Sequence, residues 1–367
     1  MRPTSCIVDL QAIEKNVRTL KALVAPTPVC AVVKADGYGH GAVPAAEAAI
    51  SAGASWLAVA LVEEGIELRK AGITVPILVM TEHPAAALEA AVAYDITCTL
   101  YSAAGLQAIA AAASSAGKVV DIHLGVDSGM TRVGVQLDQI ADFVDRVGQY
   151  PSVRLTAVWT HCPVADEPDN PFTATQLEKF GAAVREQAPD LALHVANSAT
   201  AITGQAASAG EPMMARFGIS IYGIDPDEPL AGMVDLEPAM TLRSEVSFVK
   251  TVAKGVGVGY GHHWTTDRET TIATVPIGYA DGVRRNLGKS GGGVLIGGEW
   301  YPIVGVVAMD QLMVDVGPAS TITVGDEVTL IGKQGGEQIT AAEIAKKLDT
   351  IPYEIICAVS RRVPRTY

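Results

Sequence analysis

Short apolar runs alternate with segments of helical spacing along the first two-thirds of the chain. Eight runs are rich in β-branched and other apolar residues, as buried strands are. The segments between them place apolar residues at every third or fourth position, which is typical of amphipathic helices. We therefore predict eight successive β/α units. The runs are VCAVVKA, WLAVAL, PILVM, ITCTL, VVDIHLGV, LTAVWTH, LALHVAN and MMARFGI.

The predicted strands are apolar on both faces, which favours a parallel sheet covered by helices. Eight β/α units fit a closed (β/α)8 barrel better than an open sheet. A doubly wound open sheet stays the alternative, because periodicity does not show closure. We assign this barrel to residues 1–235.

The pattern changes after Asp235 to strands and turns with few helices. We predict a mainly-β second domain over 236–367, with residues 1–10 as an alternative first strand of it. One short helix is expected at TAAEIAKKLD, where the threonine is a suitable N-cap. The predicted strand segments are MTLRSEVSFVKTV, TTIATVPIGYADG, GGVLIGGEWYPIVGVVAMDQLMVDVG, GDEVTLIGK and EIICAVSRRV.

Composition and charge narrow the class of partner. The chain has 367 residues, 49% of them hydrophobic, and a formal net charge of -13. This length supports two cored domains, and the acidic balance argues against nucleic acid or an anionic membrane surface as a partner. A small molecule is the expected ligand, and a local basic patch around an anionic cofactor stays compatible with the charge.

Cysteine usage and the absence of apolar spans favour the cytoplasm. The five cysteines are scattered and form no C-x-x-C pair, so we predict neither a disulfide framework nor a zinc site. Asp9 and Glu14 precede any apolar signal region. The longest uncharged stretch, 96–117, is too polar for a bilayer span and reads as a strand, a turn and an alanine-rich helix.

Polar residues follow the predicted barrel strands, where barrel enzymes carry their chemistry. They are Lys34, Arg132, His161, Asn197, Ser198 and Arg216. A lysine at a strand end commonly extends its ammonium to water. Its alternative use is as a nucleophile toward a carbonyl, since burial lowers its pKa. A phosphate site after the last two strands would fall at Ser198 and Gly218-Ile219, and pyridoxal 5'-phosphate is a carbonyl cofactor that joins both features.

Several motifs, in this order, resemble one family over essentially the whole chain. The sequence is similar to the fold-type III pyridoxal-phosphate alanine racemases, which interconvert L-alanine and D-alanine. The matching stretches are RPTSCIVDLQAIEKNV, AVVKADGYGHG, THCPVADE, ANSAT, ARFGISIYG, VGYG, VPIGYADGVRR, VVAMDQLMVDVG and YEIICAVSRRVPR.

The resemblance implies a two-base mechanism in a homodimer with shared active sites. Lys34 would carry the Schiff base to the cofactor and act as a base on one face of the substrate Cα. Tyr260, from the second subunit, would act on the other face. A tyrosine has an ordinary pKa of about 10 and needs a partner to work near neutral pH, which the family pattern places at His161. Arg216 would face the pyridine nitrogen, and because a guanidinium only donates, that nitrogen must accept.

The resemblance also implies the remaining contacts, and it implies no metal. Arg132 and the Met309 backbone would receive the substrate carboxylate. Tyr279 and Tyr353 would narrow the entrance and so favour a small side chain, while Asp310 would orient neighbouring groups or simply form a turn. The phosphate cradle would comprise Tyr38, Ser198, Gly218, Ile219 and Tyr353.

One position departs from the family pattern. Many alanine racemases have a carbamylated lysine where this chain has Gly125, and its negative charge holds the arginine that corresponds to Arg132. An arginine in a buried mouth needs an acceptor or anionic partner. We therefore expect a small anion, an ordered water or another carboxylate beside Arg132, the alternative being an arginine solvated enough to need none.

Three other functions remain to be weighed against alanine racemisation. A broader-specificity amino-acid racemase and a decarboxylase of the same fold are the enzymatic alternatives. A non-catalytic pyridoxal-phosphate-binding protein built from the barrel alone is the third. The decarboxylase and the binding protein are disfavoured by the VGYG and AMDQLMVDV motifs of the second domain.

Overall fold

The computed structural model describes residues 2–367, which form two compact units. The barrel unit comprises Gln11–Gly37 and Ala42–Glu237. The β unit comprises the residues up to Leu10, the short segment Tyr38–Gly41, and Pro238–Tyr367.

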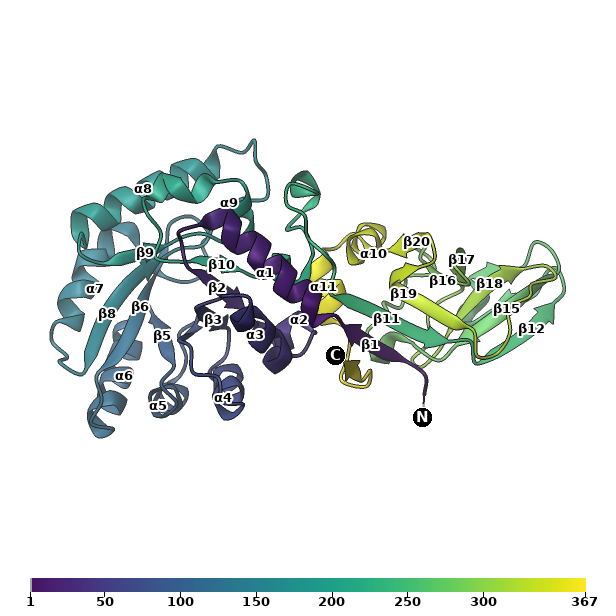
Figure 1. The fold of residues 1–367 in the computed structure, drawn as a ribbon, viewed down its shortest axis with the longest axis horizontal. Coiled ribbons are helices and arrows are strands. Elements are labelled where there is room, and N and C mark those ends of the chain that lie inside the picture. Colours follow the sequence, from purple (N-terminus) through teal and green to yellow (C-terminus); the bar gives the residue numbers. More distant parts are fainter. Residues whose placement is uncertain (1) are drawn as a thin grey trace. The chain divides into compact units, whose positions relative to one another are not determined.

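The barrel unit contains the eight predicted strands in one parallel sheet (Figure 1). The first strand pairs with both the second and the last, and the contact between the last two strands nearly closes the sheet, so the predicted barrel is confirmed. The last two strands share no ladder, but Met213 N–H donates to Leu193 O at 2.7 Å across that seam. In sheet order the strands are β10 (Ala215–Phe217), β2 (Val29–Val32), β3 (Trp56–Val59), β4 (Ile77–Val79), β5 (Thr97–Leu100), β6 (Val120–Asp127), β8 (Val153–Trp159) and β9 (Ala192–His194).

Helices surround these strands because each has one apolar face (Figure 1). The predicted strand, turn and helix over 96–117 are present, with the Ser102 Oγ accepting the Gly105 N–H as the helix cap. The helices are α1 (Leu10–Val24), α3 (Ala42–Ser51), α4 (Val62–Lys70), α5 (Ala85–Ala93), α6 (Ala103–Ser115), α7 (Ile140–Val147), α8 (Phe172–Gln187) and α9 (Ser198–Ile202), whereas α2 (Lys34–Tyr38) is a turn with left-handed backbone angles. Shorter pieces are β7 (Val135–Gln136) and the 3-10 helices η1 (Leu137–Gln139), η2 (Gln205–Ala209), η3 (Ile219–Tyr222) and η4 (Glu228–Leu230).

The β unit is built on a ten-stranded, largely antiparallel sheet, which confirms the predicted mainly-β architecture. Its first strand pairs with β11 and β21, so the start of the chain belongs to this sheet. The strands are β1 (Ser5–Val8), β11 (Met240–Glu245), β12 (Phe248–Val252), β15 (Thr270–Val275), β16 (Gly293–Ile296), β17 (Glu299–Val304), β18 (Leu312–Gly317), β19 (Glu327–Gln334), β20 (Glu337–Ile339) and β21 (Arg365–Thr366). A separate hairpin, β13 (Gly257–Val258) and β14 (Trp264–Thr265), encloses η5 (Tyr260–His262), and η6 (Tyr279–Asp281) follows β15.

Two segments near the C-terminus show where sequence patterns succeed and fail. The predicted helix is α10 (Ala341–Leu348), and its Thr340 Oγ1 accepts the Glu343 N–H at 3.0 Å in a capping box. The EIICAVSRRV segment, predicted as a strand, is instead α11 (Pro352–Cys357) followed by a turn. Pro352 pre-sets the first helical residue, and the buried Ile355, Ile356 and Val359 follow helical spacing.

No helix within residues 2–367 is long and apolar enough to cross a bilayer.

Candidate active site

Lys34 leaves the barrel sheet into a turn of unusual backbone conformation. The preceding Val33 N–H donates to Ala58 O on the neighbouring strand at 2.9 Å. Ala35, Asp36 and Tyr38 then have φ values of 52°, 54° and 53°, in the left-handed region that favours glycine. The predicted lysine therefore follows β2, and the glycine-rich motif after it forms a left-handed turn.

Arg216 lies inside the barrel, in the middle of β10, and does not follow the strand as predicted. Its side chain is 3% exposed. Nη1 donates to His194 Nδ1 and His194 O at 2.7 and 2.9 Å, and Nη2 to Thr160 O and Val195 O at 2.9 and 3.4 Å. A guanidinium has five donors. Of the five donors of Arg216, only the Nε–H makes no hydrogen bond within residues 2–367.

Two buried histidines continue the contacts of Arg216 into the barrel, and the sequence analysis missed both. His194 Nδ1 accepts from Arg216, so its Nε2 carries the proton and donates to His123 Nδ1 at 3.0 Å. The indole of Trp159 stacks on His194, with ring centroids 5.9 Å apart, and lies 5.0 Å from the Arg216 Cζ. A histidine in the middle of each apolar run was the available signal.

Burial lowers the pKa of both histidines, to about 4 for His123 and well below the ordinary value for His194. The guanidinium of Arg216 adds to the effect, since a cation disfavours a second positive charge. The two imidazoles are therefore neutral near pH 7, and burial also lowers the pKa of Arg216, to about 10. Arg216 is still the cation of this group.

His161 follows β8 and lies near the other charged residues predicted in the barrel site. Burial, together with the charges of Arg216, Arg132 and Lys34, lowers its pKa to about 3. All three cations thus lie within electrostatic range of its ring. The imidazole of His161 is neutral near pH 7, so one ring nitrogen can donate a hydrogen bond and the other can accept one.

A small pocket adjoins this cluster at the end of β6. It is lined by Gly125, Arg132, His161, Tyr101 and Asp127, among others, and its volume of about 20 Å³ suits one water or one small ion. A Cβ at position 125 would lie 3.1 Å from Thr99 Cγ2, so Thr99 occupies part of the space that a longer side chain would use. Arg132 is exposed and forms no ion pair within residues 2–367.

The loops after β9 and β10 meet at the predicted phosphate position. Ser198 begins α9, and its Oγ accepts the Gly218 N–H at 3.1 Å. The hydroxyl proton of Ser198 stays available to donate. The N–H of Ile219 makes no hydrogen bond within the described part of the chain. The two predicted cradle residues of the β unit, Tyr38 and Tyr353, also lie together, with ring centroids 6.1 Å apart.

Two turns of the β unit carry the predicted substrate residues side by side. Tyr279 N–H donates to Ala308 O, and Ala280 N–H donates to Met309 O, both at 3.0 Å. Gly278 is required here, because a Cβ would overlap the Ala308 and Met309 carbonyls. The Met309 N–H itself makes no hydrogen bond within residues 2–367.

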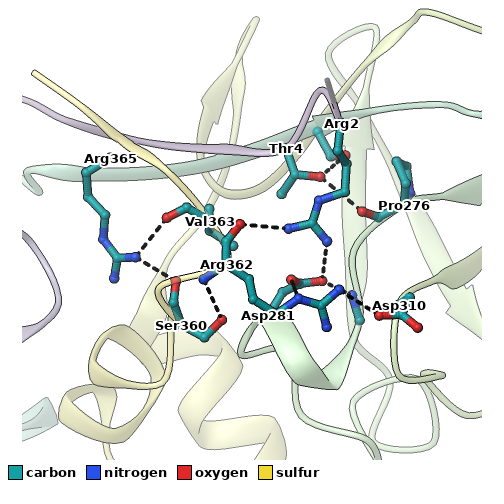
Figure 2. A network of polar contacts seen from close by, with 11 residues as sticks. Arg2, Thr4, Pro276, Asp281, Asp310, Ser360, Arg362, Val363 and Arg365 are labelled. Carbon is teal, nitrogen blue, oxygen red and sulfur yellow. Dashed lines mark hydrogen bonds and ion pairs between the residues drawn. The ribbon is translucent and has the colours of Figure 1, made fainter.

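A network of ion pairs involves Asp281 and Asp310, which belong to these two turns (Figure 2). The buried carboxylate of Asp281 pairs with Arg2 at 2.8 Å and with Arg362 Nε at 3.5 Å, and it accepts the Gly278 N–H. Arg362 also pairs with Asp310 at 2.7 Å. The predicted orienting residue Asp310 is thus one arm of a network that joins the Tyr279 turn to the Met309 turn.

Tyr260 stands at the tip of the β13–β14 hairpin. Gly259 and Gly261 on either side both have φ of 71°, which glycine adopts without strain. Its side chain is 71% exposed. The hairpin presents the phenol to the surface of this chain.

Comparisons with known proteins cover both units. The family of the alanine racemase N-terminal domain matches residues 8–226, and that of the alanine racemase C-terminal domain matches residues 239–367. Among curated relatives, an alanine racemase of Symbiobacterium thermophilum is 44% identical, covering 100% of this chain and 97% of the relative. One from Desulfovibrio desulfuricans is 42% identical, with 100% and 98% covered.

Solved structures agree over the same length. Alanine racemase from Streptomyces lavendulae superposes with a TM-score of 0.92 at 37% identity, covering 100% of this chain and 97% of that one. A histidine racemase from Leuconostoc mesenteroides superposes with a TM-score of 0.88 at 26% identity, with 100% and 98% covered. The two family matches and the full-length identities of 44% and 42% to curated alanine racemases show that the chain belongs to the alanine racemase family.

Proposed function

We propose that this chain is a pyridoxal-phosphate-dependent racemase that interconverts L-alanine and D-alanine with two bases, Lys34 and Tyr260. The observation that carries the proposal is the buried Arg216, which has one donor left over in the polar cluster that also includes Lys34 and His161. Such a free, buried donor beside a lysine suits a cofactor with an acceptor nitrogen and an aldehyde.

The donors present fit pyridoxal phosphate at both ends. Arg216 Nε–H would donate to the ring nitrogen, which must then accept and stay unprotonated. The Ser198 hydroxyl and the Ile219 N–H would hold the phosphate, with Gly218 fixed beside them. Tyr38 and Tyr353 would complete the cradle. When bound, the cofactor withdraws electrons from the substrate Cα and makes its proton acidic.

Two bases on opposite faces explain inversion. The Lys34 amine would remove or return the proton on one face of Cα, and the Tyr260 phenol would do so on the other. A single base would return the proton to the side from which it came. The neutral His161 would form a hydrogen bond with the Tyr260 oxygen. This bond would ease proton transfer to and from the phenol near neutral pH.

Substrate binding would use the remaining residues. Arg132 and the free Met309 N–H would receive the carboxylate. Tyr279 and Tyr353 would narrow the entrance, which favours the methyl group of alanine. The ion pairs of Arg362 with Asp281 and Asp310 support the role of Met309 in substrate binding, because they restrain the turn that carries it.

A homodimer with shared sites fits the exposure of the β unit's site residues. Tyr260, Met309 and Tyr279 are 71%, 52% and 42% exposed in the single chain, and large apolar groups at a surface often mark an interface. A second copy would cover them. We place the enzyme in the cytoplasm, where its five cysteines would stay reduced and where D-alanine would serve as a peptidoglycan precursor.

A broader-specificity amino-acid racemase is the second candidate. Gly125 favours it, since the glycine removes the family's usual support of the carboxylate-binding arginine. The similarity to a histidine racemase is compatible with it. Turnover of larger amino acids at rates comparable to alanine would select this function.

The test compares the wild-type protein with Lys34→Ala. Wild type should convert L-alanine to D-alanine, and it should form one borohydride-reducible cofactor adduct per chain. Lys34→Ala should lose both. An adduct at wild-type stoichiometry in Lys34→Ala would overturn the lysine assignment, and absence of any amino-acid inversion by wild type would overturn the proposed function.

A further inference from the structure

Glu64 holds the backbone immediately after Lys34 from the neighbouring loop of the barrel. Its Oε1 accepts the Ala35 N–H at 2.6 Å, and its Oε2 accepts the N–H groups of Ala60 and Leu61 at 2.9 and 3.0 Å. Glu64 lies in the first turn of α4, where the helix dipole favours a carboxylate. One side chain therefore ties the exit of β2 to the exit of β3.

The turn after Lys34 needs such an anchor. Ala35 and Asp36 adopt left-handed φ values, which are unfavourable for a residue with a side chain. Strained backbone of this kind persists only where the surroundings hold it, and it gathers at functional sites. The bond from Glu64 reaches the first residue of the strained run, directly beside the lysine.

Glu82 repeats the arrangement at the exits of β4 and β5 and so provides a comparison. Its Oε2 accepts the N–H groups of Tyr101 and Ser102 at 2.7 and 2.9 Å, and its Oε1 is hydrogen-bonded to the Ser102 hydroxyl. Ser102 has φ of -128°, an extended conformation without strain. The same type of clamp is therefore present in a place with neither a left-handed turn nor a cofactor lysine.

We propose that Glu64 is a positioning residue for Lys34, which it serves by holding Ala35 in the left-handed conformation. The proposal rests on the proposed function of Lys34. Without the anchor, Ala35 would relax toward an ordinary conformation and turn the Lys34 side chain away from the polar cluster around His161. The amine would then meet the cofactor aldehyde less often, although the barrel would stay folded.

Glu64→Gln removes the hydrogen bond that the Ala35 N–H donates to Glu64. The glutamine carbonyl can serve Ala60 and Leu61, which leaves its NH2 group facing the Ala35 N–H, and two donors repel. Glu82→Gln is the matched control, because its NH2 group can donate to the Ser102 hydroxyl while its carbonyl keeps both N–H bonds. The two variants lose the same charge on adjacent loops.

The experiment reconstitutes the full-length proteins with pyridoxal phosphate and measures the rate of borohydride-reducible adduct formation at Lys34, together with thermal unfolding. We expect Glu64→Gln to slow adduct formation about 10- to 100-fold. Glu82→Gln should stay within about twofold of wild type at a similar melting temperature. Equal adduct rates in Glu64→Gln and Glu82→Gln would overturn the positioning role.

A double variant keeps the proposal falsifiable if Glu64→Gln is poorly folded. In Glu64→Gln with Ala35→Gly, glycine adopts the left-handed conformation without strain, so most of the adduct rate should return. Failure of this rescue in a folded protein would also contradict the proposal. Lys34→Ala in the same assay separates the two hypotheses, since an adduct there would refute the lysine assignment itself, whatever Glu64 does.

Discussion

The barrel unit and the β unit hold their site residues in opposite ways. In the barrel, Arg216 is buried and nearly all of its donors are satisfied by His194 and backbone carbonyls. In the β unit, Tyr260 and Met309 are exposed, and their positions depend on glycine-flanked turns and ion pairs. The barrel thus fixes its chemistry through interior packing. The β unit presents its residues to an open surface, where a second copy could use them.

The largest effect should come from Tyr260, the most exposed of these residues. Tyr260→Phe removes the phenolic proton and should lower racemisation about 10²- to 10⁴-fold with cofactor still bound. Tyr301→Phe, a phenol of the same unit that donates to Glu299, is the control. Chiral analysis of the alanine product measures both. Unchanged turnover in Tyr260→Phe would remove the second base from the account.

Mixed dimers sharpen the same point. Subunits carrying Lys34→Ala, co-expressed with subunits carrying Tyr260→Phe, should regain part of the activity, because one of the two shared sites would then be intact. Purified dimers that contain both variants but stay inactive would show that each site uses a single chain.

Lowering the pH should destabilise the folded protein, because three histidines are held neutral in the barrel. The pKa values of His123, His161 and His194 are lowered from 6.5 in the folded protein, so all three stay neutral there and gain protons on unfolding below about pH 6.5. The unfolded state binds more protons, so stability falls as pH falls, by about 1.4 kcal/mol per proton and pH unit.

Three such histidines should make the free energy of unfolding fall by about 4 kcal/mol per pH unit near pH 5.5. Denaturant unfolding between pH 7 and 5 measures this slope. His123→Phe should reduce the slope by about a third. A slope that His123→Phe leaves unaltered would mean that His123 is not held neutral by the fold.

A moderate effect on the KM for alanine is expected from the ion pairs that join the Tyr279 turn to the Met309 turn. Arg362→Gln removes the link between Asp281 and Asp310, so the Met309 turn should lose its fixed position. The KM for alanine should rise about tenfold while kcat changes by less than about threefold. The adjacent Arg361, which is exposed and whose side chain makes no hydrogen bond or ion pair in residues 2–367, supplies the control Arg361→Gln. Equal KM values in the two variants would show that the network does not serve the substrate.

The smallest effect concerns Gly125 and Arg132. We expect a small anion such as chloride, or an ordered water, in the pocket beside Arg132, since no carboxylate pairs with that side chain in the described residues. Chloride varied at constant ionic strength should change the KM for alanine by about two- to fivefold. A crystal grown in bromide should show anomalous scattering there. An apolar gap without halide or water would contradict the expectation, and halide-independent kinetics would exclude the chloride version.

Much of the fold could be predicted because its signals are local. Each of the eight apolar runs is a barrel strand, since strands buried on both faces are apolar at every position. Thr340, the predicted N-cap, marked the start of α10 in the same way. The EIICAVSRRV segment misled because a short apolar run does not distinguish a strand from a helix. Pro352, which precedes this segment and begins α11, was the unused signal.

The site could be predicted only where a residue's place along a strand was informative. Lys34, just beyond a strand, was found by that argument. His123 and His194 were missed because an inward polar residue is acceptable only if it has partners, and partners are a property of the folded barrel. Arg362 and Asp310 were not paired in advance because they lie 52 positions apart in the sequence.

The central claim is that two bases act on opposite faces of the substrate. The most direct measurement incubates the purified enzyme with L-alanine in heavy water and follows deuterium at Cα together with the enantiomer ratio. Two bases predict that newly formed D-alanine carries solvent deuterium from the first turnovers, and that Tyr260→Phe suppresses its formation. Deuterium exchange into L-alanine without any inversion by the wild-type enzyme would contradict the claim.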